Sequence, residues 1–466
     1  MTENSGSKKL ARHNIKIPSK LPSSLAKELG SSFWKNIINS IENKEVEAIL
    51  ETIKRIDKQK GGLCLPHPFI DGIDTFPIKN VRQGMCNYIF FRDSNNQNQW
   101  ILCQCTSFVD AIFSEKYSGR HKSSTNENVI LNSINLVIKN ENKEEPIRFK
   151  IKKAIFSGYI LDQTRPYHHF YDQLKWLVNL QTKKPIVSNK SFFVPNHLQK
   201  RRHIPGKKAT FAMFPLVIGS NQLGMQPDQY SDQMEKIVYD DSLKSLNIGI
   251  FNYLKYQAIS LFKKTSVKRK TLILWFGISG QKRIWVEQED FLPALIQQLK
   301  PWFDSFVFLI DGYTQYEFNE DQMIEDSKSS GISKDLEIVN SIKEKLLPFP
   351  NASIVNLVGQ TYRKKIQQCQ SVDFFIANAG AGQLIPHRFC KKPGILHSNE
   401  KHCVFSMGIN NTTVKLVSKT LVNDVGNLFA KGKSKGVNPT GIGFISYSID
   451  VQIVVDMLTK MLKLTI

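Results

Sequence analysis

Two adjacent histidines and a downstream aspartate in the stretch RPYHHFYDQLKWL have the types and spacing needed to move a proton. His168 and Asp172 are four residues apart, and His169 and Asp172 are three apart. On a helix either spacing places both side chains on one face, so Asp172 can orient either imidazole. A histidine held in this way can take the proton from an attacking hydroxyl group. Asp162, just after the apolar stretch AIFSGYIL, is another candidate base. A structural role for the two histidines, as packing residues of the helix, stays open.

A turn of small residues follows the apolar stretch VDFFIAN. Gly380, Ala381 and Gly382 connect this predicted buried strand to a predicted helix. Such a turn exposes backbone N–H groups and the positive end of a helix dipole, which together suit a phosphate. The motif is equally compatible with tight packing of strand against helix. It is not the six-residue dinucleotide fingerprint, and no lysine of the Walker type follows it.

Charged and polar residues near other predicted strand ends are candidates for contacts with the same ligand. Lys282 and Arg283 end the turn GISGQKR, and the planar fork of an arginine suits a diphosphate. His387 stands on the helix after the glycine turn, where it can contact phosphate or sugar. Asn399 and Glu400 follow the last predicted strand, where a carboxylate can accept hydrogen bonds from ribose hydroxyls. The alternative for each is an ordinary solvated surface residue.

The elements that must position these residues show a regular pattern after residue 270. Five apolar stretches, which are TLILWFGI, SFVFLIDG, ASIVNLVG, VDFFIAN and PGILHSN, alternate with amphipathic helical stretches. Apolar strands that alternate with helices predict a doubly wound parallel sheet. Ligands bind such sheets outside the carboxyl ends of the strands. The glycine turn and the turn GISGQKR are therefore both expected to face a cleft.

The chain is long enough for more than one hydrophobic core. At 466 residues it exceeds the roughly 250–300 residues at which a single core stops growing. We expect an N-terminal helical extension over residues 1–60 and a mixed α/β domain with a strand-rich part over 61–262. A nucleotide-binding α/β domain is expected over 271–448, and a C-terminal amphipathic helix over 449–466.

Three short stretches carry a resemblance to a known family. The sequences ISGQKR with EQEDFLPAL, LVGQTYRKKIQQCQSVDFFIANAGAGQ, and the upstream RPYHHFYDQLKWL resemble glycosyltransferase family sixty-one, over roughly residue 155 to the end. The family usually has a histidine just before its Gly-Ala-Gly, where this chain has Ala379. Its usual arginine after the first strand is replaced here by Ser279-Gly280.

The resemblance implies a fold and an activity. The fold would be of the GT-B type, with two Rossmann-like domains that face a cleft and an N-terminal helical and strand-rich extension. The activity would be transfer of a sugar from a nucleotide-activated donor to a glycan or cell-surface polysaccharide, without a further cofactor or an obligatory metal. No Asp-x-Asp motif follows a predicted strand, in keeping with this expectation. The donor nucleotide, the sugar, the acceptor, the stereochemical outcome and the oligomeric state stay open.

Charge indicates the class of partner. Lys and Arg number 63 against 41 Asp and Glu, a net charge of +22, which favours phosphorylated ligands, polyanions or an anionic membrane face. The alternatives are therefore a basic nucleic-acid-binding protein and another nucleotide-dependent enzyme on a Rossmann-like scaffold. No RNA- or DNA-binding motif is recognisable, so no specific nucleic acid is expected. The seven cysteines and the polar N-terminus favour a cytoplasmic protein, with peripheral contact to the inner membrane face and a lipid-linked glycan as further options.

Overall fold

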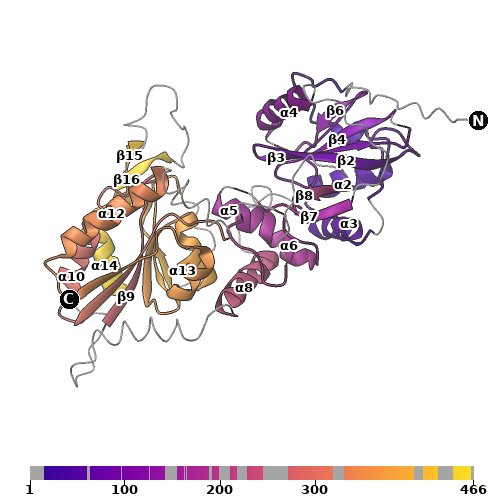
Figure 1. Cartoon of the computed structure of the whole chain (residues 1–466). Helices are drawn as coiled ribbons and strands as arrows, with labels where there is room; N and C mark the ends of the chain where they lie inside the picture. Colours follow the sequence, from indigo (N-terminus) through magenta and orange to yellow (C-terminus); the bar gives the residue numbers. More distant parts are fainter. Residues whose placement is uncertain are drawn as a thin grey trace, which may run out of the picture. The chain divides into compact units, whose positions relative to one another are not determined.

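The computed structural model describes residues 15–59, 63–95, 97–124, 126–141, 155–161, 163, 165–187, 191–198, 210–217, 228–244, 271–317, 330–402, 413–428 and 444–462. The chain divides into two compact units, Met1–Gly224 and Met225–Ile466. In Figure 1 the first unit is coloured from indigo to magenta, and most of the second from orange to yellow. Each unit has its own sheet and its own core, and each is described by itself.

The first unit is built around an antiparallel sheet of six strands in the order β1-β2-β3-β4-β5-β6. The strands are β1 (Leu65–Pro66), β2 (Asp74–Gln83), β3 (Cys86–Arg92), β4 (Gln99–Gln104), β5 (Ala111–Ser114) and β6 (Ser118–Arg120). Its helices include α1 (Leu25–Glu28), α2 (Ser32–Asn43), α3 (Val46–Lys58) and α4 (Glu127–Glu141). Apolar residues of α4 share a core with β3, β4 and β5, including Ile130 and Ile134.

The expectation of a Rossmann-like fold does not hold for this first sheet. Each strand pairs antiparallel with the next one along the chain. Short turns make this possible, such as the one at Gly84, whose φ of +56° lies in the left-handed region that glycine adopts easily. A parallel sheet needs a long crossover between neighbouring strands instead, and the alternating short strands of this segment leave no room for one.

A smaller parallel element follows in the same unit. Strand β7 (Ile155–Tyr159) pairs parallel with β8 (Thr210–Met213), and Tyr159 also forms a parallel bridge with Ile186. Between Tyr159 and Ile186 lie α5 (Pro166–His168), the π-helix η1 (His169–Leu174) and α6 (Lys175–Leu180). The segment therefore forms a strand–helix–strand crossover that carries the predicted proton-transfer residues.

Buried amide side chains attach β8 to the antiparallel sheet. Asn80 Oδ1 accepts a hydrogen bond from the Ala212 N–H at 3.2 Å, and Asn87 Nδ2 donates to the Ala212 carbonyl at 3.1 Å. Gln104 Oε1 accepts from the Phe214 N–H at 3.0 Å. These side chains satisfy backbone groups of Ala212 in β8 and of Phe214 just after it.

The second unit contains a six-stranded sheet in the order β11-β10-β9-β12-β13-β14, with every neighbouring pair parallel. Its strands are β9 (Thr271–Gly277), β10 (Ser305–Asp311), β11 (Ala352–Asn356), β12 (Phe374–Asn378), β13 (Gly394–His397) and β14 (Val414–Leu416). Counted from β9, this is the order 3-2-1-4-5-6 of doubly wound nucleotide-binding folds. The predicted parallel sheet is confirmed for this unit.

Helices cover both faces of the parallel sheet. Residues of α10 (Phe291–Leu299), α12 (Ser330–Leu346) and α14 (Val451–Met461) join one core with the sheet, and Figure 1 shows these three helices on one side of it. On the other side in Figure 1 lies α13 (Tyr362–Cys369). Helix α8 (Gln229–Lys244) packs on α13 and on the π-helix η3 (Leu384–Phe389). A short ribbon of β15 (Asn423–Gly426) and β16 (Ser446–Ser448) completes the unit, with the 3₁₀ turn η5 (Lys419–Leu421).

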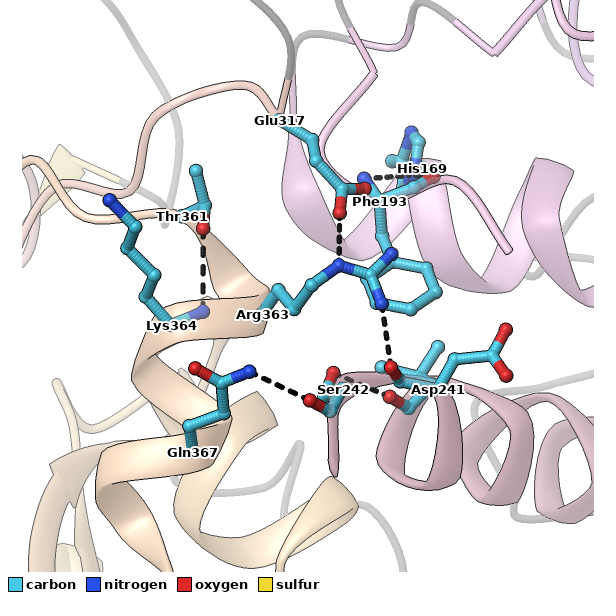
Figure 2. A network of polar contacts seen from close by, with 10 residues as sticks. His169, Phe193, Asp241, Ser242, Glu317, Thr361, Arg363, Lys364 and Gln367 are labelled. Carbon is cyan, nitrogen blue, oxygen red and sulfur yellow. Dashed lines mark hydrogen bonds and ion pairs between the residues drawn. The ribbon is translucent and has the colours of Figure 1, made fainter. Parts of the chain in front are cut away.

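Side chains of α13 hold the carboxyl end of α8 in place, as Figure 2 shows. Arg363 Nη1 donates to the carbonyl of Asp241 at 2.8 Å, and Gln367 Nε2 donates to the carbonyl of Ser242 at 2.8 Å. Glu317 pairs with the same Arg363. Because the last carbonyls of a helix have no partner within the helix, these donors satisfy the end of α8 and fix it on α13.

A buried ion pair joins β10 to α13. Lys365 Nζ lies 2.6 Å from Asp311 Oδ1, and it also reaches the carbonyls of Gly312 and Tyr313 and the hydroxyl of Thr314. Lys365 is completely buried. Burial raises the pKa of Asp311 and lowers that of Lys365, while each charge opposes the shift of the other. Asp311 is therefore held at the end of β10 as a partner of Lys365.

We predict that Lys365→Met lowers the free energy of unfolding by about 3–5 kcal/mol, because it leaves the Asp311 carboxylate buried without its cation. Lys364→Met is the matched control, since Lys364 is exposed on the same helix and its substitution is expected to change stability by less than about 0.5 kcal/mol. Urea denaturation of both variants measures the difference. Equal stabilities of the two variants would show that the pair is dispensable.

Candidate functional site

The strand order of the second unit reverses between β9 and β12, and this switch point is where such sheets bind ligands. Two predicted turns lie there, namely the segment after β9 that contains Lys282 and Arg283, and the segment after β12 that contains Gly380. Asn378 ends β12 and His397 ends the neighbouring β13. The carboxyl ends of three adjacent strands thus gather the polar residues of the candidate site.

Hydrogen bonds fix the turn after β9 at several points. Ser279 N–H donates to Gln288 Oε1 at 3.1 Å, and Gln288 Nε2 donates back to the Ser279 carbonyl at 3.2 Å. Ser279 Oγ donates to the carbonyl of Lys282 at 2.6 Å. The Ile284 carbonyl then accepts the N–H of Tyr447 at 2.9 Å. Arg283 therefore stands at a corner whose two sides are both held.

Arg283 adopts an unusual backbone conformation at this corner. Its φ is +51°, in the left-handed region that costs a residue with a Cβ roughly 1–2 kcal/mol. Its side chain contacts the glycine turn, because a Cβ on Gly380 would lie only 2.6 Å from Nη2 of the guanidinium. Nη1 lies 2.8 Å from Nε2 of His402 and donates to it. Strained conformations of this kind concentrate at functional sites.

The space above Gly380 is thus filled by this arginine of the same chain. Gly380 itself has a φ of 177°, an extended conformation that any residue adopts. Glycine is therefore needed here to leave space for the guanidinium of Arg283, and not for its backbone conformation. At Gly382 an added Cβ would meet only the Cβ of Asn378, at an ordinary 3.7 Å. The two glycines of the motif therefore differ, since only the first is required for close approach of another group.

Three further side chains form a buried network beside Gly380. Tyr447 Oη accepts from Asn378 Nδ2 at 3.0 Å and lies 2.7 Å from His397 Nδ1. Complete burial lowers the pKa of His397 to about 3, so the imidazole is neutral. Donation of the single hydroxyl proton of Tyr447 to Nδ1 would place the histidine's own proton on Nε2. Within the described part of the chain, Asn378 Oδ1 and His397 Nε2 are buried without a hydrogen-bond partner, which is uncommon.

The turn after β13 presents His402 to Arg283. Asn399 Oδ1 accepts the N–H of His402 at 2.9 Å, while Asn399 Nδ2 donates to the carbonyl of Ile445 at 2.9 Å. Asn399, a predicted ligand contact, is therefore connected to Arg283 by way of His402. Glu400 is exposed, and its N–H donates to Asp424 Oδ1 at 2.9 Å.

The remaining predicted ligand contacts of this unit lie in different surroundings. Lys282 places its ammonium group 4.9 Å from the centre of the Phe444 ring. Ala381 begins a 3₁₀ turn, η2 (Ala381–Gln383), which leads into η3, so the predicted helix after the glycine turn is confirmed. His387 lies inside the fold, with Nδ1 2.9 Å from Gln383 Oε1 and its ring stacked on Phe375. Burial and the neighbouring Arg388 lower the pKa of His387 to about 4.

In the first unit His168 and Asp172 lie in contact. His168 Nδ1 is 2.6 Å from Asp172 Oδ2, across the junction between α5 and the π-helix η1. The His168 side chain is 27% exposed and that of Asp172 only 6%. A carboxylate that accepts the Nδ1 proton leaves the lone pair of a neutral imidazole on Nε2, which is the form of a general base. π-Helical turns are rare and frequently occur at functional sites.

His169 has a different environment from that of His168. It is completely buried, and its Nε2 lies 3.2 Å from both the N–H and the carbonyl of Phe193 (Figure 2). Burial lowers the pKa of His169 to about 3. This is the environment of a neutral packing residue. The other candidate base, Asp162, lies outside the described residues.

Several residues of the switch point were not predicted from sequence. Asn378 carried a usable signal, since it is a polar residue at the end of a buried strand, directly before the glycine turn. Tyr447 and His402 carried none, because nothing in their neighbourhood along the chain links them to the turns they contact. In the described part of the chain no group of three or more His, Cys, Asp or Glu side chains is placed to hold a metal ion. No helix there is long and apolar enough to cross a bilayer.

We predict that His397 stays neutral, as the Nε2–H tautomer, from pH 8 to about 4.5. The ordinary pKa is 6.5 and the folded value about 3, so between these values the unfolded chain binds more protons and acidification disfavours the folded state. Nitrogen-15 NMR of the imidazole measures both charge and tautomer. Tyr447→Phe is the control, because removal of its hydroxyl frees Nδ1 and is expected to yield a mixture of tautomers. Titration of His397 near pH 6.5 would contradict the burial.

We compared the chain with protein-family models and with curated protein sequences, and neither comparison gave a match. The features that bear on function are therefore the contacts of the switch point in the second unit and the His168–Asp172 pair in the first.

Proposed function

We propose that the second unit binds the diphosphate of a nucleotide-activated sugar at its switch point, and that the protein is a glycosyltransferase that needs no metal. The observation that carries the proposal is Arg283, held in a left-handed conformation in the turn after β9 with its guanidinium on Gly380. The family resemblance of the same two turns supports the same activity. The acceptor in this proposal is a hydroxyl group of a glycan or polysaccharide.

Arginine at this position suits a diphosphate for electrostatic reasons. Its planar cation can form two parallel hydrogen bonds with phosphate oxygens, and each charge-assisted bond contributes about 1.5–3 kcal/mol. The neighbouring His402 accepts from Nη1 and so orients the guanidinium. A cation preorganised in this way also stabilises the negative charge that develops on a departing diphosphate, the role that a metal ion has in other transferases.

A dinucleotide oxidoreductase is a weaker interpretation of the same sheet. Those enzymes use an acidic residue at the end of the second strand to hold the ribose hydroxyls. Asp311 has that position here, but its carboxylate is bound by the buried Lys365. The turn after β9 also lacks the Gly-x-Gly-x-x-Gly sequence, and the next helix, α10, does not begin until Phe291.

In the first unit we propose His168 as the general base. Its Nε2 would take the proton of the acceptor hydroxyl as the oxygen attacks the anomeric carbon and the bond from that carbon to the diphosphate breaks. Asp172 would hold the ring and stabilise the imidazolium that forms. His169 is excluded from this role in the proposal because it is buried against Phe193.

We predict that one of UDP, GDP, CMP or their sugars raises the melting temperature. A ligand at 100 times its dissociation constant stabilises by about 2.7 kcal/mol. Arg283→Ala is expected to weaken that ligand about ten- to a hundredfold, which corresponds to the loss of one charge-assisted bond. Gly380→Ala should also weaken it, because the new Cβ displaces the guanidinium. Gly382→Ala is the matched control and should bind normally.

Two outcomes of this thermal-shift series would count against the donor site. One is that no nucleotide stabilises the protein. The other is that Arg283→Ala binds as tightly as the parent. Steeply salt-dependent binding of any nucleic acid duplex, without turnover of a sugar nucleotide, would favour the basic nucleic-acid-binding alternative instead.

We predict that His168→Ala and Asp172→Asn lower kcat about 10²- to 10⁴-fold on the substrate pair found by the screen, with little change in stability. His169→Ala is expected to lower stability instead, because it empties a buried site. Steady-state rates and denaturation midpoints together separate the two effects. Full turnover by the His168 and Asp172 variants would return the search for a base to Asp162.

A further inference from the structure

One buried carboxylate links two loops at the carboxyl edge of the parallel sheet. Asp335, on α12, is only 5% exposed. Its Oδ1 accepts the N–H of Gly280 at 2.8 Å, in the loop after β9. Its Oδ2 accepts the N–H of Tyr313 at 2.7 Å, in the loop after β10. Both oxygens are therefore used, and each holds a different loop.

The two loops are shaped to receive this carboxylate. A Cβ on Gly280 would lie 2.9 Å from Asp335 Oδ1, and a Cβ on Gly312 would lie 2.6 Å from Oδ2. Such distances are shorter than real Cβ contacts, so both positions require the absence of a side chain. Glycine at 280 and at 312 is thus explained by the approach of Asp335.

The loop after β10 is also held from its other side. Lys365 Nζ donates to the carbonyls of Gly312 and Tyr313, at 3.0 and 3.1 Å, while Asp335 accepts the Tyr313 N–H. That loop is consequently rigid, and Asp335 transfers its fixed position to Gly280. Only two residues separate Gly280 from Arg283.

We propose that Asp335 is a positioning residue for the diphosphate site, which holds the turn after β9 so that Arg283 meets the ligand. This inference rests on the proposed function. Asp335 itself is bonded to backbone amides and acts on the ligand only through the turn.

The chemistry of the group explains why a carboxylate is required. A carboxylate accepts on both oxygens, whereas an asparagine offers one acceptor and turns an NH₂ group toward the second amide. A protonated carboxyl has the same defect, since its O–H faces one of the two N–H donors. Burial raises the pKa of Asp335 to about 6, against the hydrogen bonds from Tyr313 and Gly280.

The other charged groups near Asp335 are few among the described residues. Lys365 on α13 lowers its pKa and Asp311 on β10 raises it. Lys334 precedes it on α12, and atoms of that residue lie beside Gly280. Lys365 and Asp311 carry opposite charges and lie in contact. Protonation of Asp335 on acidification through about pH 6 is therefore expected to release one of the two loops.

The experiment compares the parent with Asp335→Asn, Glu337→Gln, Arg283→Ala and the double variant of Arg283→Ala with Asp335→Asn. Glu337 is exposed on the same helix and serves as the control. The probes are UDP-glucose and GDP-mannose, whose diphosphates carry no group that titrates between about pH 5 and 8. Calorimetry gives the affinity from pH 7.5 to 5.0. Amide hydrogen exchange at Gly280 and Tyr313 reports the two loops directly.

We expect Asp335→Asn to weaken binding about tenfold at pH 7.5 and to remove its pH dependence, while Glu337→Gln behaves as the parent. The parent should lose about tenfold in affinity as the pH falls to 5.0. In the Arg283→Ala background the Asp335 substitution should have no further effect. Faster exchange of at least one of the two amides should accompany Asp335→Asn.

Failures of the two proposals are distinguishable. If neither probe binds the parent, or Arg283→Ala binds normally, the proposed function fails, and hydrogen exchange still decides whether Asp335 holds the loops. If Arg283→Ala loses binding but Asp335→Asn keeps it, with unchanged exchange, the positioning role is overturned. If Asp335→Asn does not fold, hydrogen exchange of the parent decides instead: Gly280 and Tyr313 amides that exchange as fast as exposed loop amides at pH 7.5 would overturn the positioning role.

Discussion

The contact between the Arg283 guanidinium and the backbone of Gly380 is the interaction on which the second unit's candidate site depends. It joins the turn after β9 to the turn after β12. These two strands are neighbours in the sheet, although Arg283 and Gly380 lie almost a hundred residues apart in sequence. The contact requires a residue without a side chain at 380 and an arginine whose backbone is bent into the left-handed region. The left-handed backbone of Arg283 is strained, and the hydrogen bonds on either side of the corner keep it in this conformation.

The second unit also contains buried ion pairs. Asp311 with Lys365, and Glu235 with Arg388 and Lys391, place ionised groups where desolvation is expensive. These pairs hold the loop after β10 and the helix α8, and they leave no free carboxylate at the end of β10. The switch point itself holds the cation of Arg283 and the neutral imidazole of His397.

The first unit is built differently from the second, since its main sheet is antiparallel and helix α4 packs against it. The proton-transfer candidates lie outside that sheet, on the helical crossover between Tyr159 and Ile186. The π-helical turn there places His168 and Asp172 in contact and turns the adjacent His169 inward. His168 and His169 were equally plausible candidates in the sequence, but in the structure His168 is partly exposed and His169 is completely buried.

Local patterns in the sequence determined much of this protein. Apolar strands alternating with helices after residue 270 predict the parallel sheet, because burial on both faces demands such strands. The spacing of His168 and His169 to Asp172 predicts that either imidazole can contact the carboxylate, since helix geometry is local. The small residues after Phe375 likewise predict a tight strand-to-helix turn, which the structure has.

Only the tertiary structure decided which residues meet at long range. A Rossmann-like fold was wrongly expected for the first unit, because the short turns between its strands pair them antiparallel. Arg283 meets Gly380, Tyr447 meets His397, and Asp335 meets Gly280 because the strand order folds distant loops onto one edge. Such contacts arise from the packing of whole elements, and no local sequence pattern encodes them.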